Sequence, residues 1–136
     1  MAHIKEIKNS VLLAVVLQFS AGAHALQDCS KGTSDGEVEA CSENNKNLAE
    51  AALNKEYSEA KKRISDVFSQ DENVRKNYME IFTEAQRSWL KFRGFQCEME
   101  AHPAVKGTNQ YLDYVNTCLA NLDVERNNTL KKIPYD

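Results

Sequence analysis

The sequence predicts an all-α protein: a three-helix antiparallel bundle with two long helices, tied by two disulfides and preceded by a cleaved signal peptide. Its 136 residues suit one domain, and they include five Gly and two Pro. These are too few for the tight turns of a many-stranded sheet. Apolar residues recur at steps of three to five through most of the chain, which is typical of amphipathic helices. The cysteine count is four, an even number that fits disulfide pairing after export.

Residues 1–25 have the pattern of a secretory signal peptide. Lys5 and Lys8 form a basic start, an apolar run follows over 11–19, and Ala23 and Ala25 form a small-x-small cleavage site. The apolar run is about half of the roughly 20 residues that a membrane-spanning helix needs. We therefore expect export to the periplasm or the medium without stable membrane insertion, and we divide the chain into a signal peptide (1–25) and a helical domain (26–136).

The exported domain is mildly acidic. Without Lys5, Lys8 and Glu6, the remaining 111 residues carry 15 basic and 19 acidic side chains, a net charge of −4. A nucleic-acid-binding protein needs a clustered basic surface to neutralise phosphates, and this acidic charge balance does not indicate one. We therefore expect no nucleic-acid partner. It favours encounter with a basic protein instead.

Two long helices are predicted first. Ser34 and Glu37 have the spacing of a capping box, so the first helix begins there. Its predicted apolar stripe consists of Leu48, Ala52, Tyr57, Ala60, Ile64 and Val67. A turn near Gln70 leads to a second helix running back along the first. The stripe predicted for this helix consists of Val74, Tyr78, Ile81, Ala85, Trp89, Phe92 and Met99.

One loop separates the second helix from the third. Pro103 removes a backbone donor and disfavours helical geometry at His102, and Gly107 loosens the chain further. We therefore expect a loop over 101–108. The third helix is supported by Tyr111, Val115, Cys118, Leu122 and Leu130, and it is expected to end by Pro134.

The four cysteines are expected to form two disulfides in an oxidising compartment. Folding of the second and third helices about the loop would set Cys97 and Cys118 at similar heights, so we prefer Cys97–Cys118 with Cys29–Cys41. Two other sets remain open, namely Cys29–Cys97 with Cys41–Cys118 and Cys29–Cys118 with Cys41–Cys97. The cysteines are isolated and lack the C-x-x-C pairs of a zinc site, so we expect no metal.

The second predicted helix contains the run AQRSWLKFR (85–93), and a cysteine follows at Cys97. Together with Cys41, the segment 53–57, Cys118 and Arg126, this order resembles the LprI-like family. That family comprises small exported helical domains named for a lysozyme-inhibitor lipoprotein. The resemblance covers nearly all of the exported domain, and it implies a helical fold and an inhibitory function.

The signature residues in this chain are Asn54, Tyr57, Gln86, Arg87, Trp89 and Arg93. We expect them to be structural. Trp89 is in phase with the apolar stripe and is expected in the core. An arginine beside a small helical core usually binds a carboxylate or the carbonyls at a helix end, which is the role expected for Arg87 and Arg93. Asn54 is expected to form a hydrogen bond between helices.

No catalytic residue and no cofactor are predicted. His102 is the sole histidine after residue 25, and the sequence contains no Gly-rich phosphate-binding motif. No serine or cysteine has the local signature of an activated nucleophile. These observations favour a protein that acts by binding.

The favoured hypothesis is an exported inhibitor that blocks a lysozyme-like cell-wall hydrolase by inserting the loop 102–108. Such enzymes hold two carboxylates across a cleft, and His102 and Lys106 are the candidate donors to them. The alternative is an envelope interaction module, or an immunity protein for an exported toxin, without enzymatic activity. That alternative places binding on an aromatic patch at Tyr111 and Tyr114.

Overall fold

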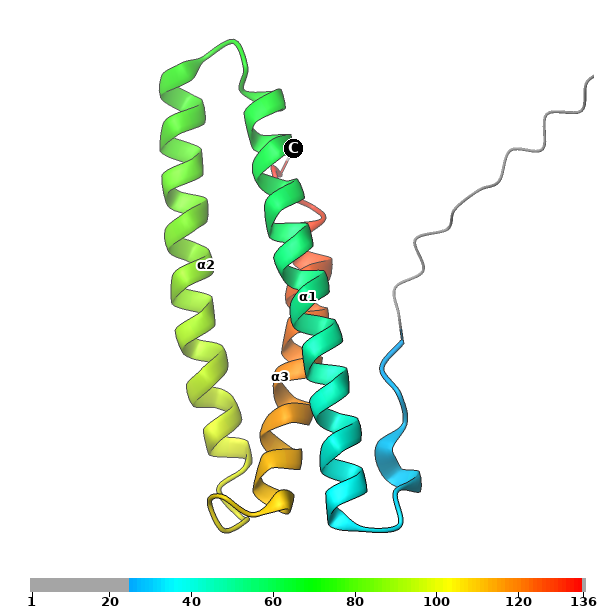
Figure 1. Cartoon of the computed structure of the whole chain (residues 1–136). Helices are drawn as coiled ribbons and strands as arrows, with labels where there is room; N and C mark the ends of the chain where they lie inside the picture. Colours follow the sequence, from blue (N-terminus) through cyan, green and yellow to red (C-terminus); the bar gives the residue numbers. More distant parts are fainter. Residues whose placement is uncertain (1–24, 136) are drawn as a thin grey trace, which may run out of the picture.

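The computed structural model describes residues 25–135, so the predicted signal peptide lies outside the described residues except for Ala25. The described part comprises the short 3₁₀ helix η1 (Cys29–Lys31) and the helices α1 (Asp35–Val67), α2 (Glu72–Glu100) and α3 (Asn109–Leu130) (Figure 1). No strand occurs over residues 25–135. The predicted all-α class, with two long helices and a shorter third, is confirmed.

The three helices lie side by side, with α2 antiparallel to both α1 and α3 (Figure 1). Most of the packing joins α3 to α1; α2 has fewer contacts with α3, and α1 and α2 have the fewest. The turn at 68–71 lies at one end, hereafter the turn end. The loop at 101–108 and the start of α1 lie at the other, hereafter the loop end.

Each α-helix begins at a side-chain cap. The Ser34 hydroxyl accepts from the Glu37 amide at 3.3 Å, as the capping-box prediction requires. The Glu37 carboxylate, however, binds the amide and hydroxyl of Thr33, at 2.7 and 2.6 Å. Asp71 caps α2 and Thr108 caps α3. These caps account for the helix starts.

The apolar core is concentrated in the half of the bundle nearer the turn end. Its buried members are Leu53, Ala60, Ile64, Phe82, Leu130 and Ile133. Tyr57 packs against this cluster and stacks on the ring of Phe82, with the centroids 5.0 Å apart. The buried side chains nearer the loop end are small or polar, among them Ser42, Asn45 and Asn116. Apolar burial therefore stabilises the loop end less than the turn end.

The predicted stripe of α1 is partly wrong. Leu48 and Val67 are 52% and 62% exposed, whereas Ala49 and Leu53 are buried. Since α3 is the main element covering α1, the buried stripe is narrow, and toward the loop end it continues through polar residues such as Asn45. An apolar pattern does not detect such positions.

The predicted stripe of α2 is wrong over most of its length. Ile81, Phe92 and Met99 are exposed, while Phe82 and Gln86 are buried. The bundle therefore covers a face of α2 about one residue, or roughly 100°, from the predicted one. Trp89 lies between the two faces and is half-buried against the core.

Both preferred disulfides are confirmed. The Cα atoms are 5.7 Å apart in Cys29–Cys41 and 5.5 Å apart in Cys97–Cys118, within the usual range for a disulfide. Each bridge closes a loop of one to two dozen residues. By lowering the entropy of the unfolded chain, it raises the free energy of unfolding by about 3 kcal/mol. Both bridges lie toward the loop end, where the apolar core is thin.

Candidate binding site

Three signature side chains on the bundle face of α2 join it to α3. Arg93 donates through Nη1 to both carboxylate oxygens of Asp123, at 2.6 and 2.9 Å. Asp123 is fully buried, and Glu50 on α1 lies 3.9 Å from the Arg93 guanidinium. Burial raises the pKa of Asp123 above its ordinary value, and the hydrogen bonds and charge of Arg93 oppose this rise.

Trp89 completes this network. The guanidinium carbons of Arg93 and Arg126 lie 5.6 and 5.5 Å from its ring centroid, within the range of cation–π contacts. Arg126 also donates through Nε to the buried Gln86 side chain at 2.9 Å. Burial lowers the pKa of Arg126. Gln86, Trp89 and Arg93 therefore lie within the packing of α2 on α3.

The other signature residues lie apart from this network. Tyr57 is half-buried and its hydroxyl lies 3.5 Å from the Thr83 hydroxyl on α2. Arg87 is exposed and binds Glu84 on its own helix, so the expected tie to a neighbouring helix is absent among the described residues. Asn54 is exposed on α1, which does not agree with a hydrogen bond between helices.

The loop between α2 and α3 presents both predicted donors to solvent. His102 and Lys106 are exposed, and Val105 between them is 75% exposed. The loop is hydrogen-bonded internally: the Thr108 hydroxyl donates to the Val105 carbonyl at 2.7 Å. Gly107 has φ of 88°, a conformation that favours glycine. The sequence here thus folds into a short, ordered protrusion.

The two tyrosines of the alternative site are only partly accessible. Tyr111 is half-buried, and Tyr114 is 39% exposed, with its hydroxyl accepting from Gln110 at 3.2 Å. They do not form the broad exposed aromatic patch expected at the start of α3.

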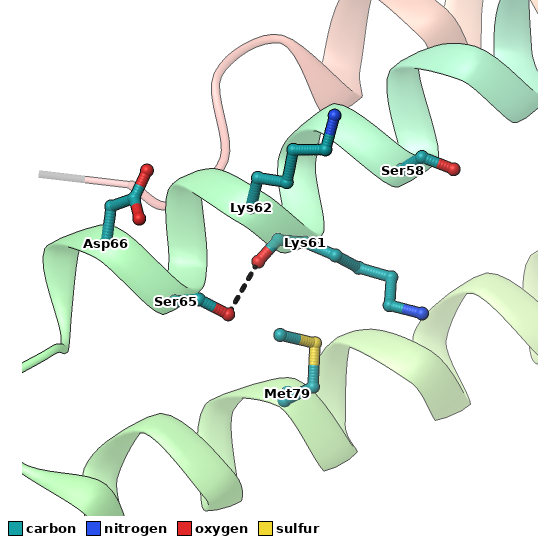
Figure 2. Close-up of a pocket in the computed structure, with 6 residues that line it drawn as sticks. All are labelled: Ser58, Lys61, Lys62, Ser65, Asp66 and Met79. Atoms are coloured by element: carbon teal, nitrogen blue, oxygen red, sulfur yellow. Dashed lines mark hydrogen bonds between the residues drawn. The ribbon is translucent and has the colours of Figure 1, made fainter.

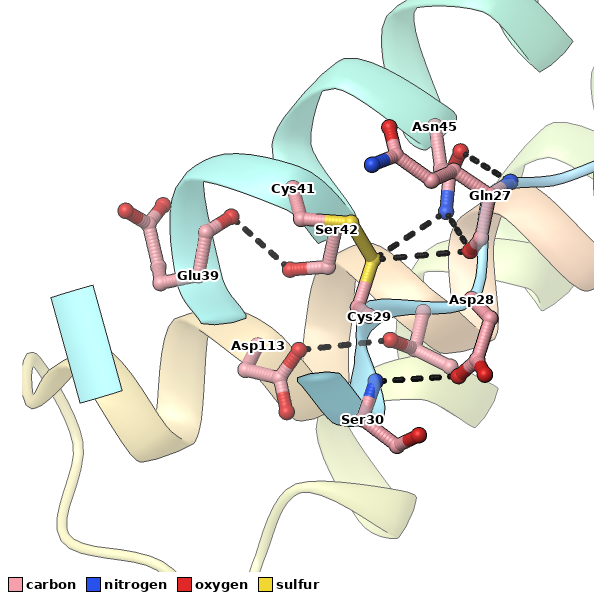
Figure 3. Close-up of a disulfide and its surroundings, with 10 residues drawn as sticks. Gln27, Asp28, Cys29, Ser30, Glu39, Cys41, Ser42, Asn45 and Asp113 are labelled. Carbon is pink, nitrogen blue, oxygen red and sulfur yellow. Dashed lines mark hydrogen bonds between the residues drawn. A yellow bond between two sulfur atoms is a disulfide. The ribbon is translucent and has the colours of Figure 1, made fainter. Parts of the chain in front are cut away.

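The segment before α1 is fastened to that helix by a disulfide and by hydrogen bonds (Figure 3). Asn45 on α1 accepts from the Gln27 amide at 2.9 Å and donates to the Gln27 carbonyl at 2.8 Å. The bridge from Cys29 to Cys41 anchors the same segment two residues later. Together they hold the segment before α1 along that helix.

Carboxylates gather at the loop end. Exposed members come from the segment before α1, the start of α1 and the end of α2, namely Asp28, Asp35, Glu37, Glu43, Glu98 and Glu100. Hydrogen bonds from Thr33 lower the pKa of Glu37, and those from Ser30 lower the pKa of Asp28. Both therefore remain ionised into mild acid. Sequence reasoning found the acidic balance but missed its location, although the acidic run at 35–43 was a signal of it.

Two shallow hollows occur between α1 and α2, far from this loop. The first has a volume of about 360 Å³, and its lining includes Lys61 and Met79 (Figure 2). The Ser65 hydroxyl in its wall donates to the Lys61 carbonyl at 3.0 Å. The second, of about 690 Å³, mixes acidic and basic side chains, including Arg75 and Glu80. Neither hollow gathers polar groups of one kind around a ligand position.

Comparison with known proteins supports the family resemblance drawn from the motif in α2. Residues 28–130 match the family described as "Lysozyme inhibitor LprI". An uncharacterized protein of Rhizobium meliloti (strain 1021) is 29% identical over 131 residues, which cover 89% of this chain and 91% of that protein. No solved structure matches the chain.

Two further structural findings concern membranes and metals. None of the described helices combines the length and apolar character needed to cross a membrane. Within residues 25–135, no three His, Cys, Asp or Glu side chains are grouped as a metal ion requires.

Proposed function

Because the chain belongs to the LprI lysozyme-inhibitor family, we propose that it binds a lysozyme-like cell-wall hydrolase and blocks it with the loop 102–108. The family and the two disulfides indicate an extracytoplasmic protein. The observation that carries the proposal is the exposed, disulfide-bounded loop at the acidic end. We also propose that the signal peptide is cleaved after Ala25, leaving a chain that begins at Leu26.

The acidic loop end supports binding to a basic enzyme. The start of α1 and the end of α2, which carry exposed carboxylates, lie at the same end of the bundle as the loop, and these charges create a negative field there. Such a field increases the rate of encounter with a positively charged surface and orients the partner toward the loop.

The loop then supplies cations to the enzyme's cleft. Glycosidases of this class place two carboxyl groups about 5 to 9.5 Å apart across the scissile bond. Lys106 is the principal donor to this pair, and His102 is the second. The Cys97–Cys118 bridge and the hydrogen bond from Thr108 hold the loop in one shape before binding. This order reduces the entropy lost when the complex forms.

A lysis assay tests the proposal. The exported chain at micromolar excess should slow at least one lysozyme of the chicken, goose or invertebrate type. His102→Ala with Lys106→Ala should weaken inhibition by about tenfold or more. Lys131→Ala, which changes an exposed lysine near the end of α3, is the matched control and should have no effect. Failure to slow any of the three lysozymes would overturn the proposal.

The same variants distinguish the alternative function. Tyr111→Ala with Tyr114→Ala should leave lysozyme inhibition within about twofold of the unmodified chain. In a pull-down from envelope extract, partner binding could be lost only when the two tyrosines are changed. That result would show that the protein is an interaction module or a toxin-immunity protein instead.

A further inference from the structure

Helix α2 carries an apolar stripe on a face that lies to the side of the bundle and is largely exposed. Its exposed large side chains are Val74, Ile81, Phe92, Phe95 and Met99, with 44%, 62%, 54%, 69% and 63% of each residue accessible. Ala85 and Ser88 fill two of the intervening positions, and the third holds Tyr78, which is half-buried and packs partly against the apolar core. The steps along this stripe alternate strictly between four and three residues over all eight positions.

This stripe is distinct from the bundle-facing stripe of the same helix. At about 100° per residue, it lies roughly 100° around α2 from Phe82, Gln86 and Arg93. Those three side chains are buried or bound to α3, so they are not available to a partner. An alternation of four and three is the spacing of a coiled-coil seam, which packs against another helix. Within residues 25–135 its five large members named above are exposed, and of its eight positions Tyr78 is the one that packs against the core.

We propose that α2 pairs with α2 of a second copy of this chain, antiparallel and about a twofold axis. The seam has small residues at its centre, Ala85 and Ser88, and larger residues on both sides. Antiparallel pairing centred between these two positions places Ala85 opposite Ser88 of the second copy. The small pair at the axis then lets the two helices approach closely.

The same register matches the remaining positions. Ile81 lies opposite Phe92 of the second copy, and Val74 lies opposite Met99 of the second copy. Phe95 lies opposite Tyr78 of the second copy, which offers only the part of its ring that is not packed against the core. A parallel arrangement in register would instead set Phe92 against its own equivalent. Beside the seam, the antiparallel register brings Glu84 near Lys91 of the second copy, two opposite charges on exposed positions.

The seam supplies more than half of the area of a standard interface. Five large side chains, each about half to two-thirds exposed, offer roughly 500 Å² of apolar surface on each copy. Standard interfaces bury about 800 Å² on each partner, and flanking residues supply the difference. The helix is 29 residues long, and the seam extends over 26 of them, from Val74 to Met99.

Sedimentation of the exported chain with both disulfides formed tests this dimer. We expect a monomer–dimer equilibrium between about 1 and about 100 μM. Phe92→Glu with Phe95→Glu should weaken dimerisation at least about tenfold, because charge would enter the seam. Leu48→Glu is the matched control: Leu48 on α1 is 52% exposed, close to the 54% of Phe92. A monomer throughout this range, or equal weakening by Leu48→Glu, would overturn the proposal.

Cross-linking tests the register independently. Ala85→Cys and Ser88→Cys chains, mixed and oxidised, should give a mixed disulfide-linked dimer in higher yield than either chain alone. Preferential cross-linking of Ala85→Cys with itself would indicate a parallel pair and contradict the antiparallel arrangement. Circular dichroism of each variant checks that the bundle remains folded. The dimer does not depend on lysozyme binding, so either proposal can fail while the other holds.

Discussion

Arg93 on α2 binds both carboxylate oxygens of the fully buried Asp123 on α3, at 2.6 and 2.9 Å. This pair joins two helices whose remaining contacts are few compared with those between α1 and α3. A charge-assisted contact of this kind is directional, so it specifies how α2 is rotated and seated on α3. Arg93, one residue of the family signature, thus helps to hold α2 on α3.

Arg93→Met should destabilise the protein by about 3 to 5 kcal/mol at neutral pH, because it leaves the Asp123 carboxylate buried without its cation. Chemical denaturation followed by circular dichroism measures the change. The double variant Arg93→Met with Asp123→Leu should recover much of the loss, since it buries no charge. A double variant as unstable as the single one would show that the cost arises from lost packing.

The deficit of Arg93→Met should also depend on pH. Burial raises the pKa of Asp123 above its ordinary 3.8. The folded chain therefore holds this proton to higher pH than the unfolded chain, and stability declines as pH rises through the folded pKa. In Arg93→Met no positive charge opposes the effect of burial, so the loss of stability with rising pH becomes larger. We expect a smaller deficit near pH 4 than near pH 7, and equal deficits at both would contradict the assignment.

Leu53→Ala and Leu48→Ala should differ sharply, although both leucines lie on α1. Leu53 is 1% exposed and belongs to the core cluster, so its truncation should cost about 2 to 5 kcal/mol. Leu48 is 52% exposed, and its truncation should change stability by less than about 0.5 kcal/mol. Urea unfolding of the two variants tests which face of α1 is buried. A larger cost for Leu48→Ala than for Leu53→Ala would show that the stripe expected from the sequence is the buried one.

Loss of the Cys97–Cys118 bridge should affect stability and inhibition together. Cys97→Ala with Cys118→Ala should cost about 3 kcal/mol and weaken lysozyme inhibition, because the loop ends are no longer tied. Cys29→Ala with Cys41→Ala should cost a similar amount and leave inhibition nearly unchanged, since that bridge does not bound the loop. Equal loss of inhibition in both variants would argue against the loop as the binding site.

Glu98→Gln with Glu100→Gln should slow association with a basic lysozyme at low ionic strength, by about threefold or more. The effect should shrink near physiological salt, where exposed charges are screened beyond about 8 Å. Glu59→Gln with Glu72→Gln is the control, because these carboxylates lie toward the turn end. Surface plasmon resonance gives the association rates. A larger effect of the control pair would contradict steering by the acidic end.

Local chemistry explains what was predictable. The cap at Ser34, the turn near Gln70 and the loop around Pro103 depend on residues a few positions apart, so the sequence contains the whole interaction. The bridge between Cys97 and Cys118 was predictable from the position of that loop. Two helices that fold back about a loop place residues at similar distances from it side by side. The α2 signature was recognisable for a different reason, the fixed order of its residues.

The partners of that signature were not predictable. Gln86 binds Arg126 and Arg93 binds Asp123, in each case across 30 or more positions of sequence. The gathering of carboxylates at the loop end likewise depends on bringing the start of α1 and the end of α2 to the same end of the bundle. Such groupings arise from topology, which no short pattern contains.

The sequence by itself determined three helices, where they begin and end, and which cysteines could pair, because these depend on local backbone preferences and on chain order. The tertiary structure decided which face of each helix is buried. The buried face of α2 includes the polar residues Gln86 and Arg93, so apolar periodicity favoured the neighbouring face, roughly 100° away, which is exposed. The packing of the neighbouring helices determines which face of α2 is buried: it covers Phe82 and leaves Phe92 exposed.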